Sequence, residues 1–237
     1  CSSGDPNAVP WPCSKNAITV TSLTTTIAQV TAGVLFSCAI TKSGNAKCWG
    51  ANEHGQLGDG TTVEREVPVD VSGLNDAIYI SAGEIHTCAV NRAGAVKCWG
   101  DNAYGQLGDG TTESHNVPVE VSGLSSGVIA VSASGRHTCA LLNTGGVKCW
   151  GLYGLLGQLG EHSVETCDTP DSGVQECSKT PMAVFGISNG VISLSAGASH
   201  TCVVLSAGNA KCWGANGYKQ LGDGTKINRQ TPVEVVW

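Results

Sequence analysis

The sequence has little charge. Only 14% of its 237 residues are Asp, Glu, Lys or Arg, and the formal net charge at pH 7 is −6. A protein that binds nucleic acid gathers lysine and arginine on one surface, where they displace the counterions of the phosphate backbone. The scarcity of basic residues therefore predicts that nucleic acid is not a partner.

Long apolar runs and cofactor motifs are also missing. Gly, Ser and Thr interrupt the apolar residues throughout, and no run approaches the roughly 18 residues that cross a bilayer. The sequence has neither a dinucleotide-binding fingerprint nor a Cys-x-x-Cys-His site for haem attachment. We therefore predict no transmembrane segment, no cofactor and no enzymatic activity.

Cysteine, by contrast, is abundant. The twelve cysteines are an even number, and such a content is unusual for the reducing cytosol. No two cysteines are separated by only two residues, as the ligands of a structural zinc site often are. We predict a secreted, extracellular protein without a metal site. The predicted disulfides are Cys1–Cys13, Cys38–Cys48, Cys88–Cys98, Cys139–Cys149, Cys167–Cys177 and Cys202–Cys212.

The first residue allows two interpretations. Mature bacterial lipoproteins begin with a lipid-bearing cysteine, and Cys1-Ser2-Ser3 is compatible with that pattern. A Cys1–Cys13 bridge would instead leave no thiol of the twelve unpaired, so we prefer the bridge and keep lipid anchoring as the alternative. Residues 1–16 hold three of the eight prolines and no apolar alternation. They are predicted to be a leader segment outside the folded domain at 17–237.

One segment recurs four times along the rest of the chain. The copies begin at Cys38, Cys88, Cys139 and Cys202, at intervals of 50, 51 and 63 residues. A recurring period of this length indicates a repeat architecture. The longest interval contains an insertion at about 161–180, which carries Cys167 and Cys177 and is predicted to be a surface loop closed by its own disulfide.

Each copy contains four short runs rich in Val, Ile and Thr, separated by glycine or polar turns. This pattern predicts an all-β fold, and four-stranded units repeated about every 50 residues are typical of the blades of a β-propeller. Within each copy the two cysteines bracket a glycine at one position, namely Gly44, Gly94, Gly145 and Gly208. A glycine of positive φ in such a turn would place the cysteines opposite each other in a hairpin, within disulfide reach.

The ends of the chain predict a surplus strand. We take the run AITV at 17–20 as the first strand of the first unit, and the Pro-Val-x-Val runs as its counterparts in later units. The C-terminal run at 231–237 is then a fifth copy, although four units need only four. This strand could close a ring within one chain or pair with another molecule, where a contact that does not close produces a fibre. The candidate self-association residues are Ile18, Val20, Val233, Val235 and Trp237.

The motifs G-x-x-H-T-C-A, G-x-x-K-C-W-G-x-N and G-Q-L-G-D-G-T, followed by P-V-x-V, resemble the regulator of chromosome condensation repeat family. They are most similar to its bacterial secreted, alpha-tubulin-suppressor-like members. The resemblance covers about residues 17–237. It implies a β-propeller, often seven-bladed, that binds proteins. The nucleotide exchange activity of the founding member is not expected here, because this chain is acidic and rich in cysteine and has four repeats.

Three repeated side chains could carry chemistry, and each has a structural explanation. His86, His137 and His200 share one position, but Phe36 replaces them in the first copy, so we predict packed and hydrogen-bonded side chains. Asp in Gly-Asp-Gly-Thr is predicted to stabilise a turn. The tryptophan that follows the second cysteine of each copy is predicted to pack between blades.

The sequence therefore predicts a secreted, non-enzymatic β-propeller that acts as a structural or protein-interaction module. Self-assembly through its terminal strands into an oligomer or filament is the most specific form of this prediction. The alternative is a soluble monomeric binding protein, such as an inhibitor, adhesin or lectin-like protein. That protein would use loops on one face, with the insertion at 161–180 as the candidate site of specificity.

Overall fold

The computed structural model describes residues 19–20, 23, 25–153, 157–160, 165–169 and 173–236. The leader at 1–16, the predicted Cys1–Cys13 bridge, Ile18 and Trp237 lie outside these residues. In the described part of the chain, no helix has the length and apolarity needed to cross a membrane.

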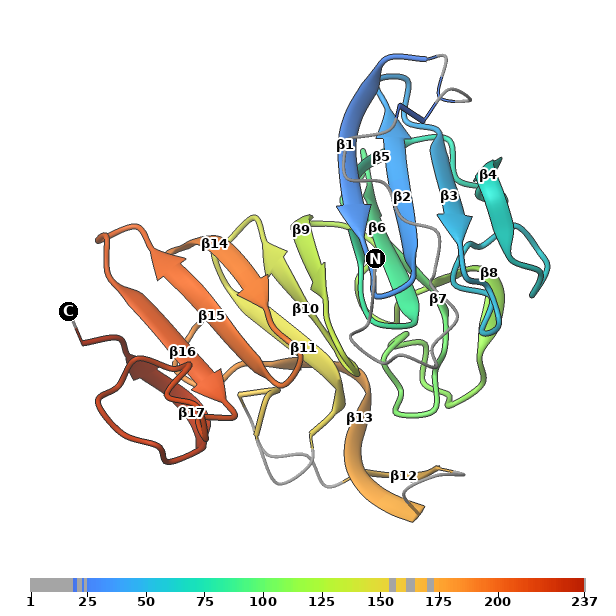
Figure 1. Cartoon of the computed structure of the whole chain (residues 1–237). Helices are drawn as coiled ribbons and strands as arrows, with labels where there is room; N and C mark the ends of the chain where they lie inside the picture. Colours follow the sequence, from blue (N-terminus) through green and yellow to red (C-terminus); the bar gives the residue numbers. More distant parts are fainter. Residues whose placement is uncertain are drawn as a thin grey trace, which may run out of the picture.

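The strands form four antiparallel sheets, which we call blades 1 to 4, and each follows one repeat of the sequence (Figure 1). The prediction of an all-β array of four blades is confirmed. The strands of blades 1 and 2 are β1 (Ile27–Ala32), β2 (Phe36–Thr41), β3 (Ala46–Gly50), β4 (Arg65–Asp70), β5 (Ala77–Ala82), β6 (His86–Asn91), β7 (Val96–Gly100) and β8 (His115–Glu120). Those of blades 3 and 4 are β9 (Val128–Ala133), β10 (His137–Leu142), β11 (Val147–Leu152), β12 (Glu165–Thr169), β13 (Gly173–Ala183), β14 (Val191–Ala196), β15 (His200–Leu205), β16 (Ala210–Gly214) and β17 (Arg229–Glu234).

The prediction of which strand begins each blade is wrong. The Pro-Val-x-Val run is the fourth strand of its blade and not the first of the next one, because β4 pairs with β3 and β17 pairs with β16. Val233 lies opposite Cys212, and the Val235 amide donates to the Ala210 carbonyl at 3.0 Å. Val20 is 39% exposed and belongs to no strand. The C-terminal strand is therefore not surplus, because it completes blade 4.

The insertion in the third repeat is a hairpin and not only a loop. Strand β12 pairs with the first half of β13, and the second half of β13 pairs with β11 as the fourth strand of blade 3. The third sheet therefore has five strands. Cys167 and Cys177 are bonded to each other, which confirms the predicted disulfide within the insertion.

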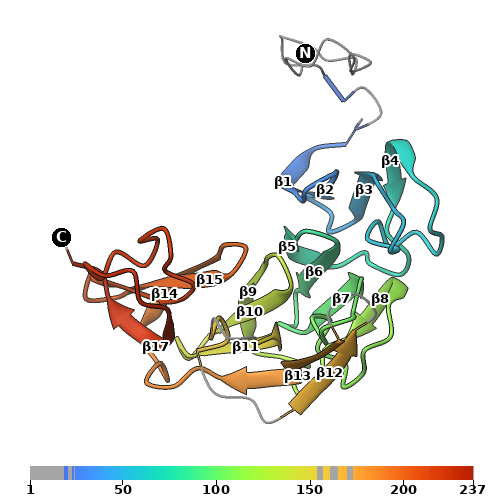
Figure 2. The same cartoon turned by 60° about the horizontal axis from the view of Figure 1, so that its bottom comes forward.

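The four blades form an open arc (Figure 2). The first strands of neighbouring blades contact one another along the inner side, β1 with β5, β5 with β9 and β9 with β14. The fourth strands lie on the outer side, and blades 1 and 4 stand apart in both views (Figures 1 and 2). A ring within one chain is therefore not formed by the described residues.

Disulfides join the two central strands of every blade. Cys38 lies directly opposite Cys48 in the register of β2 and β3, and the three other blades repeat this pair. The glycine of each connecting turn has the predicted positive φ, between 79° and 98°. The bonded pairs in the blade centres are Cys38–Cys48, Cys88–Cys98, Cys139–Cys149 and Cys202–Cys212. On the chain-entropy model, a bridge over a loop of this length contributes about 3 kcal/mol.

Candidate functional site

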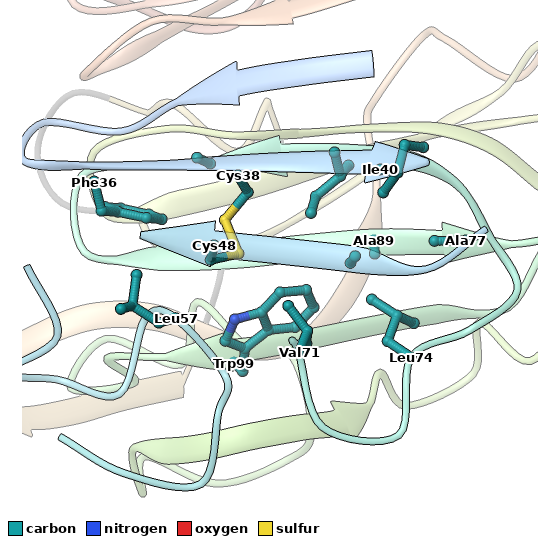
Figure 3. Close-up of a cluster of buried hydrophobic side chains, with 13 residues drawn as sticks. Phe36, Cys38, Ile40, Cys48, Leu57, Val71, Leu74, Ala77, Ala89 and Trp99 are labelled. Carbon is teal, nitrogen blue, oxygen red and sulfur yellow. A yellow bond between two sulfur atoms is a disulfide. The ribbon is translucent and has the colours of Figure 1, made fainter. Parts of the chain in front are cut away.

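Among the described residues, the joint between consecutive blades is an extensive polar structure that occurs three times. In blades 1 to 3, the face that carries the disulfide packs on the tryptophan of the following blade. In the joint of blades 1 and 2, the Cys38–Cys48 bridge and Leu57 lie against Trp99 and Ala89 (Figure 3). Trp99, Trp150 and Trp213 have no exposed surface, so the predicted packing of tryptophan between blades is confirmed at these three positions.

A glutamine carbonyl receives two hydrogen bonds at every joint. In the joint of blades 2 and 3, the indole N–H of Trp150 and the hydroxyl of Thr138 both donate to the Gln106 carbonyl at 2.9 Å. Gln56 and Gln158 accept the same two bonds at the other joints. All these groups are buried, so each bond also removes the cost of an unsatisfied polar atom.

A histidine extends this network across two of the joints. His86 Nε2 lies 2.8 Å from Thr138 Oγ1, and His137 Nε2 lies 2.9 Å from Thr201 Oγ1. Each threonine uses its own proton on a glutamine carbonyl, so the histidine must donate from Nε2. The predicted packed and hydrogen-bonded role is confirmed for these two histidines. Phe36 holds this position in blade 1, and there the ring packs without a hydrogen bond to Thr87.

Both histidines are neutral at physiological pH. Burial lowers the pKa of His86 to about 4 and that of His137 to about 3, with a smaller effect on His137 from His86 and His200. A neutral imidazole that donates from Nε2 leaves Nδ1 as an acceptor. For His137 that atom lies 2.8 Å from the Ser134 hydroxyl. Gly83 holds the corresponding place beside His86.

In blades 1 to 3, the Gly-Gln-Leu loop rests on the fourth strand of the next blade. Gly55 has φ +77°, and a Cβ at this position would lie 2.6 Å from the Asn116 Cα. The loop is also tied there, because the Gly60 amide donates to the Asn116 carbonyl and the Asn116 side chain donates to the Gly60 carbonyl, both at 2.9 Å. The joint therefore requires glycine at position 55 for two reasons, the φ angle and the close approach of a backbone.

Gly55→Ala is expected to destabilise the protein by about 2 kcal/mol more than Gly73→Ala. Both glycines have positive φ, so both substitutions carry about 1 kcal/mol of backbone strain. No atom lies within 4 Å of a Cβ at Gly73, whereas the one at Gly55 meets the next blade. Overpacking of this kind costs about 1–3 kcal/mol. Urea unfolding of the two variants measures the difference, and equal losses would show that the joint is not tight at Gly55.

The repeated aspartates stabilise turns, as predicted. Asp59 Oδ1 accepts from the Thr61 amide at 2.9 Å and from its hydroxyl at 2.7 Å, and Oδ2 accepts from Arg65 Nε at 2.8 Å. Burial alone would raise the pKa of Asp59, but these bonds outweigh it and lower the pKa. Asp223 is held in the same way by Thr225 and Arg229, which also lowers its pKa. Within the described ranges, no group of three or more His, Cys, Asp or Glu could hold a metal ion.

Two segments match the Gly-x-Ser-x-Gly pattern of serine hydrolases, at 123–127 and 186–190. That pattern supports a nucleophile only where it links a strand to a helix. Both segments here lie in the connection between the fourth strand of one blade and the first strand of the next, with Ser125 and Ser188 exposed. The matches do not indicate a catalytic serine.

At the two ends of the arc, blade 1 and blade 4 each expose a face that is buried in a joint in the other blades. Val30 on blade 1 is 66% exposed, whereas Ile80 at the same strand position of blade 2 is 1% exposed. On blade 4, His200 is partly exposed, whereas His86 and His137 are fully buried. The sequence does not mark these surfaces as exposed, because the residues at the same repeat positions in the other blades are buried.

Comparison with known proteins identifies the repeat. The regulator of chromosome condensation (RCC1) repeat matches residues 43–90 and 93–141, and a second description of this repeat matches 27–56, 77–106, 128–158 and 191–220. The chain is 33% identical over 215 residues to the human probable E3 ubiquitin-protein ligase HERC4, covering 88% of the chain and 19% of HERC4. It is 32% identical over 213 residues to the ultraviolet-B receptor UVR8 of Arabidopsis thaliana, covering 88% of the chain and 46% of the receptor.

Solved structures show the same fold. The chain superposes on yeast RCC1 (Prp20), in the structure of that protein bound to Kap60, with a TM-score of 0.77 and 21% identity over 90% of the chain and 49% of Prp20. For human WBSCR16 the TM-score is 0.75 and the identity 25%, over 90% of the chain and 54% of the human protein. The chain spans about half or less of the length of these four proteins. With one match in each blade, and matches over about half of its residues, the chain belongs to the regulator of chromosome condensation (RCC1) repeat family.

Proposed function

We propose that this protein is a secreted, non-enzymatic β-propeller module that binds proteins and assembles with other copies of itself into an extracellular oligomer or filament. One observation carries the proposal. The arc ends on two exposed faces, and they bear the two complementary halves of a joint that the molecule builds three times internally. The contacts between copies are expected to resemble those between blades.

The disulfides support an oxidising compartment. Five bridges are present among the described cysteines, and none of those cysteines is free. Disulfides of this kind persist outside the cell and are rare in the cytosol. Cys1 lies outside the described residues; the proposal takes it as bridged to Cys13, with lipid anchoring at Cys1 as the alternative.

The relatives support protein binding. Yeast RCC1 (Prp20), which shares this fold, has been solved bound to Kap60, so a protein that contains this fold binds another protein. In the present chain His86 and His137 are engaged in joints, and Asp59 and Asp223 in turns. These four side chains contribute to structure, which favours a binding module over an enzyme.

Sedimentation velocity and electron microscopy of the oxidised protein test self-assembly. We expect the sedimentation coefficient to rise with protein concentration and the images to show rings or filaments of arcs joined at their ends. Because β17 is an integral part of blade 4, a deletion of residues 231–237 would damage the blade and is not a suitable test. A chain that stays monomeric at the highest attainable concentration would contradict self-assembly.

The alternative is a monomeric binding protein that uses the β12–β13 hairpin. This hairpin is the largest departure of any copy from the repeat, and Val174 on it is 65% exposed. Loops that differ in this way are where repeat scaffolds place specificity.

Replacing residues 161–180 by residues 109–117 of blade 2 separates self-association through the ends of the arc from binding through the hairpin. The exchange gives blade 3 a turn that the chain already uses, and it puts an asparagine at the joint position where Asn116 already packs against Gly55. We expect the exchanged protein to fold and to self-associate as the wild type does. A loss of self-association with intact thermal stability would show that the hairpin, and not the ends of the arc, makes the contact between copies.

A further inference from the structure

We propose that the ends of two copies join head to tail, with the loop at 216–222 on blade 4 of one copy seated in an acidic hollow on blade 1 of the next, so that Lys219 faces Glu66. This inference rests on the self-association proposed above and specifies its partner surface. The partner is a second copy of this chain.

The pairing follows from positions that meet at every internal joint. The glycine of the Gly-Gln-Leu loop faces one position on the fourth strand of the next blade, the residue that follows the partner of the third-strand glycine. A Cβ on that glycine would lie 2.6–2.9 Å from the Cα of the facing residue. The facing pairs are Gly55 with Asn116, Gly105 with Lys179 and Gly157 with Gln230. The corresponding residue of blade 4 is Lys219, and that of blade 1 is Glu66. A fourth joint between two copies therefore places a lysine opposite a glutamate.

Lys219 is exceptional in its backbone conformation. Its φ is +64°, and it is the only residue other than glycine with positive φ among the described positions. Lysine at this angle costs about 1–2 kcal/mol where glycine would cost nothing. Its Cβ prevents the joint from closing as tightly as an internal one, so the docked copy lies slightly further out. The long lysine side chain spans this extra distance toward Glu66.

The hollow on blade 1 has the complementary charge. It has a volume of about 550 Å³, and its walls include Glu53, Glu64 and Glu66. Arg65 also lines the hollow, but Asp59 holds its guanidinium at 2.6 Å. The equivalent surface of blade 2 is covered by the loop of blade 1, because Gly100 lies against Gln56. The hollow is therefore the seat of a Gly-Gln-Leu type loop, and Lys219 is a suitable cation to enter it.

Next to Lys219 and Glu66, two large side chains occupy positions that contact each other in an internal joint. In the joint of blades 2 and 3, Tyr104 lies against Arg136, whose guanidinium donates to the tyrosine hydroxyl at 2.6 Å. The same two positions at the ends of the chain are Tyr218 and Leu35, which are 95% and 75% exposed. A head-to-tail joint would bring these two exposed side chains into contact.

The hydrogen-bonding groups are also in place at the ends. Gln220 provides the backbone carbonyl on blade 4 that corresponds to that of Gln106. Ser37 and Trp49 provide the hydroxyl and the indole N–H on blade 1 that correspond to those of Thr138 and Trp150. Gln220, His200 and Tyr218 line a hollow of about 490 Å³ at the exposed end of blade 4. The end faces therefore carry the donors and acceptors that a fourth joint needs.

Charge reversal tests the proposal by sedimentation equilibrium of the full chain. Lys219→Glu and Glu66→Lys each place like charges opposite each other, so each is expected to weaken self-association by about tenfold or more. The double variant restores an opposite pair and is expected to recover most of the wild-type affinity. Arg92→Glu in blade 2 makes the same change in net charge as Lys219→Glu but lies away from both ends, and it is expected to have no effect.

Each other result has a distinct meaning. Self-association that is unaffected by either reversal, or a double variant that stays as weak as the single ones, would overturn the head-to-tail joint and leave self-assembly standing. A monomeric wild type together with self-association of Lys219→Gly would show that the lysine blocks the joint, and would overturn both proposals. Association that begins only when residues 1–16 are removed would show that this segment of the same chain occupies the hollow, which also overturns the joint.

Discussion

Replacing Trp150 by alanine should lower the free energy of unfolding by about 4 kcal/mol, whereas the same replacement at Trp49 should cost less than half as much. Both tryptophans follow the second cysteine of their blade. Trp150 is fully buried between blades 2 and 3 and donates to the Gln106 carbonyl. Removing a buried aromatic side chain of this size typically costs about 3–5 kcal/mol. Trp49 is only partly buried, because no described blade precedes it.

Urea unfolding of the oxidised protein measures this pair of variants. Trp150→Phe separates packing from hydrogen bonding, since it keeps most of the apolar contact and should cost about 1 kcal/mol for the lost bond plus a smaller packing loss. If Trp49→Ala proved as damaging as Trp150→Ala, the tryptophan would be stabilising its own blade and not the joint. In that case blade 1 would not offer a joint face to a second copy.

Acidification from pH 7 to pH 5 should lower the free energy of unfolding by about 4 kcal/mol, with about 2 kcal/mol from each of His86 and His137. In the folded protein the pKa of these side chains falls to about 4 and about 3, whereas an unfolded histidine has the ordinary value of 6.5. Between these values the unfolded chain binds more protons than the folded one, so stability decreases as the pH falls. The contribution is fully present above pH 6.5.

His86→Phe provides the control for this pH dependence. Phe36 already occupies the same position in blade 1, so the joint accepts the ring, and Thr138 can still donate to the Gln106 carbonyl. The variant should lose about half of the pH-dependent change while it keeps most of its stability at pH 7. His200 has a lowered pKa as well, but its partial exposure makes its share smaller. A pH profile that is identical in wild type and variant would refute the assignment to His86.

Features formed by residues close together in the sequence could be predicted, whereas contacts between distant residues could not. The turn of Asp59 and the hairpin of Cys38 and Cys48 involve residues within about ten positions of one another, and both were predicted correctly. The roles of the tryptophans and histidines were predicted from their regular recurrence and from Phe36 at the histidine position. Their partners were not, because Gln106 and Trp150 are 44 residues apart and meet only when two blades pack.

The amino-acid sequence by itself determined that this is an all-β repeat protein, with four blades that each carry a disulfide across the central hairpin. It did not determine where a blade begins, because a periodic pattern is unchanged when the starting point of the unit is shifted. Only the hydrogen bonds of the sheets assign the Pro-Val-x-Val strand to the end of its blade, which removes the surplus strand. The packing angle between blades, also a tertiary property, leaves four of them as an open arc whose two end faces stay exposed.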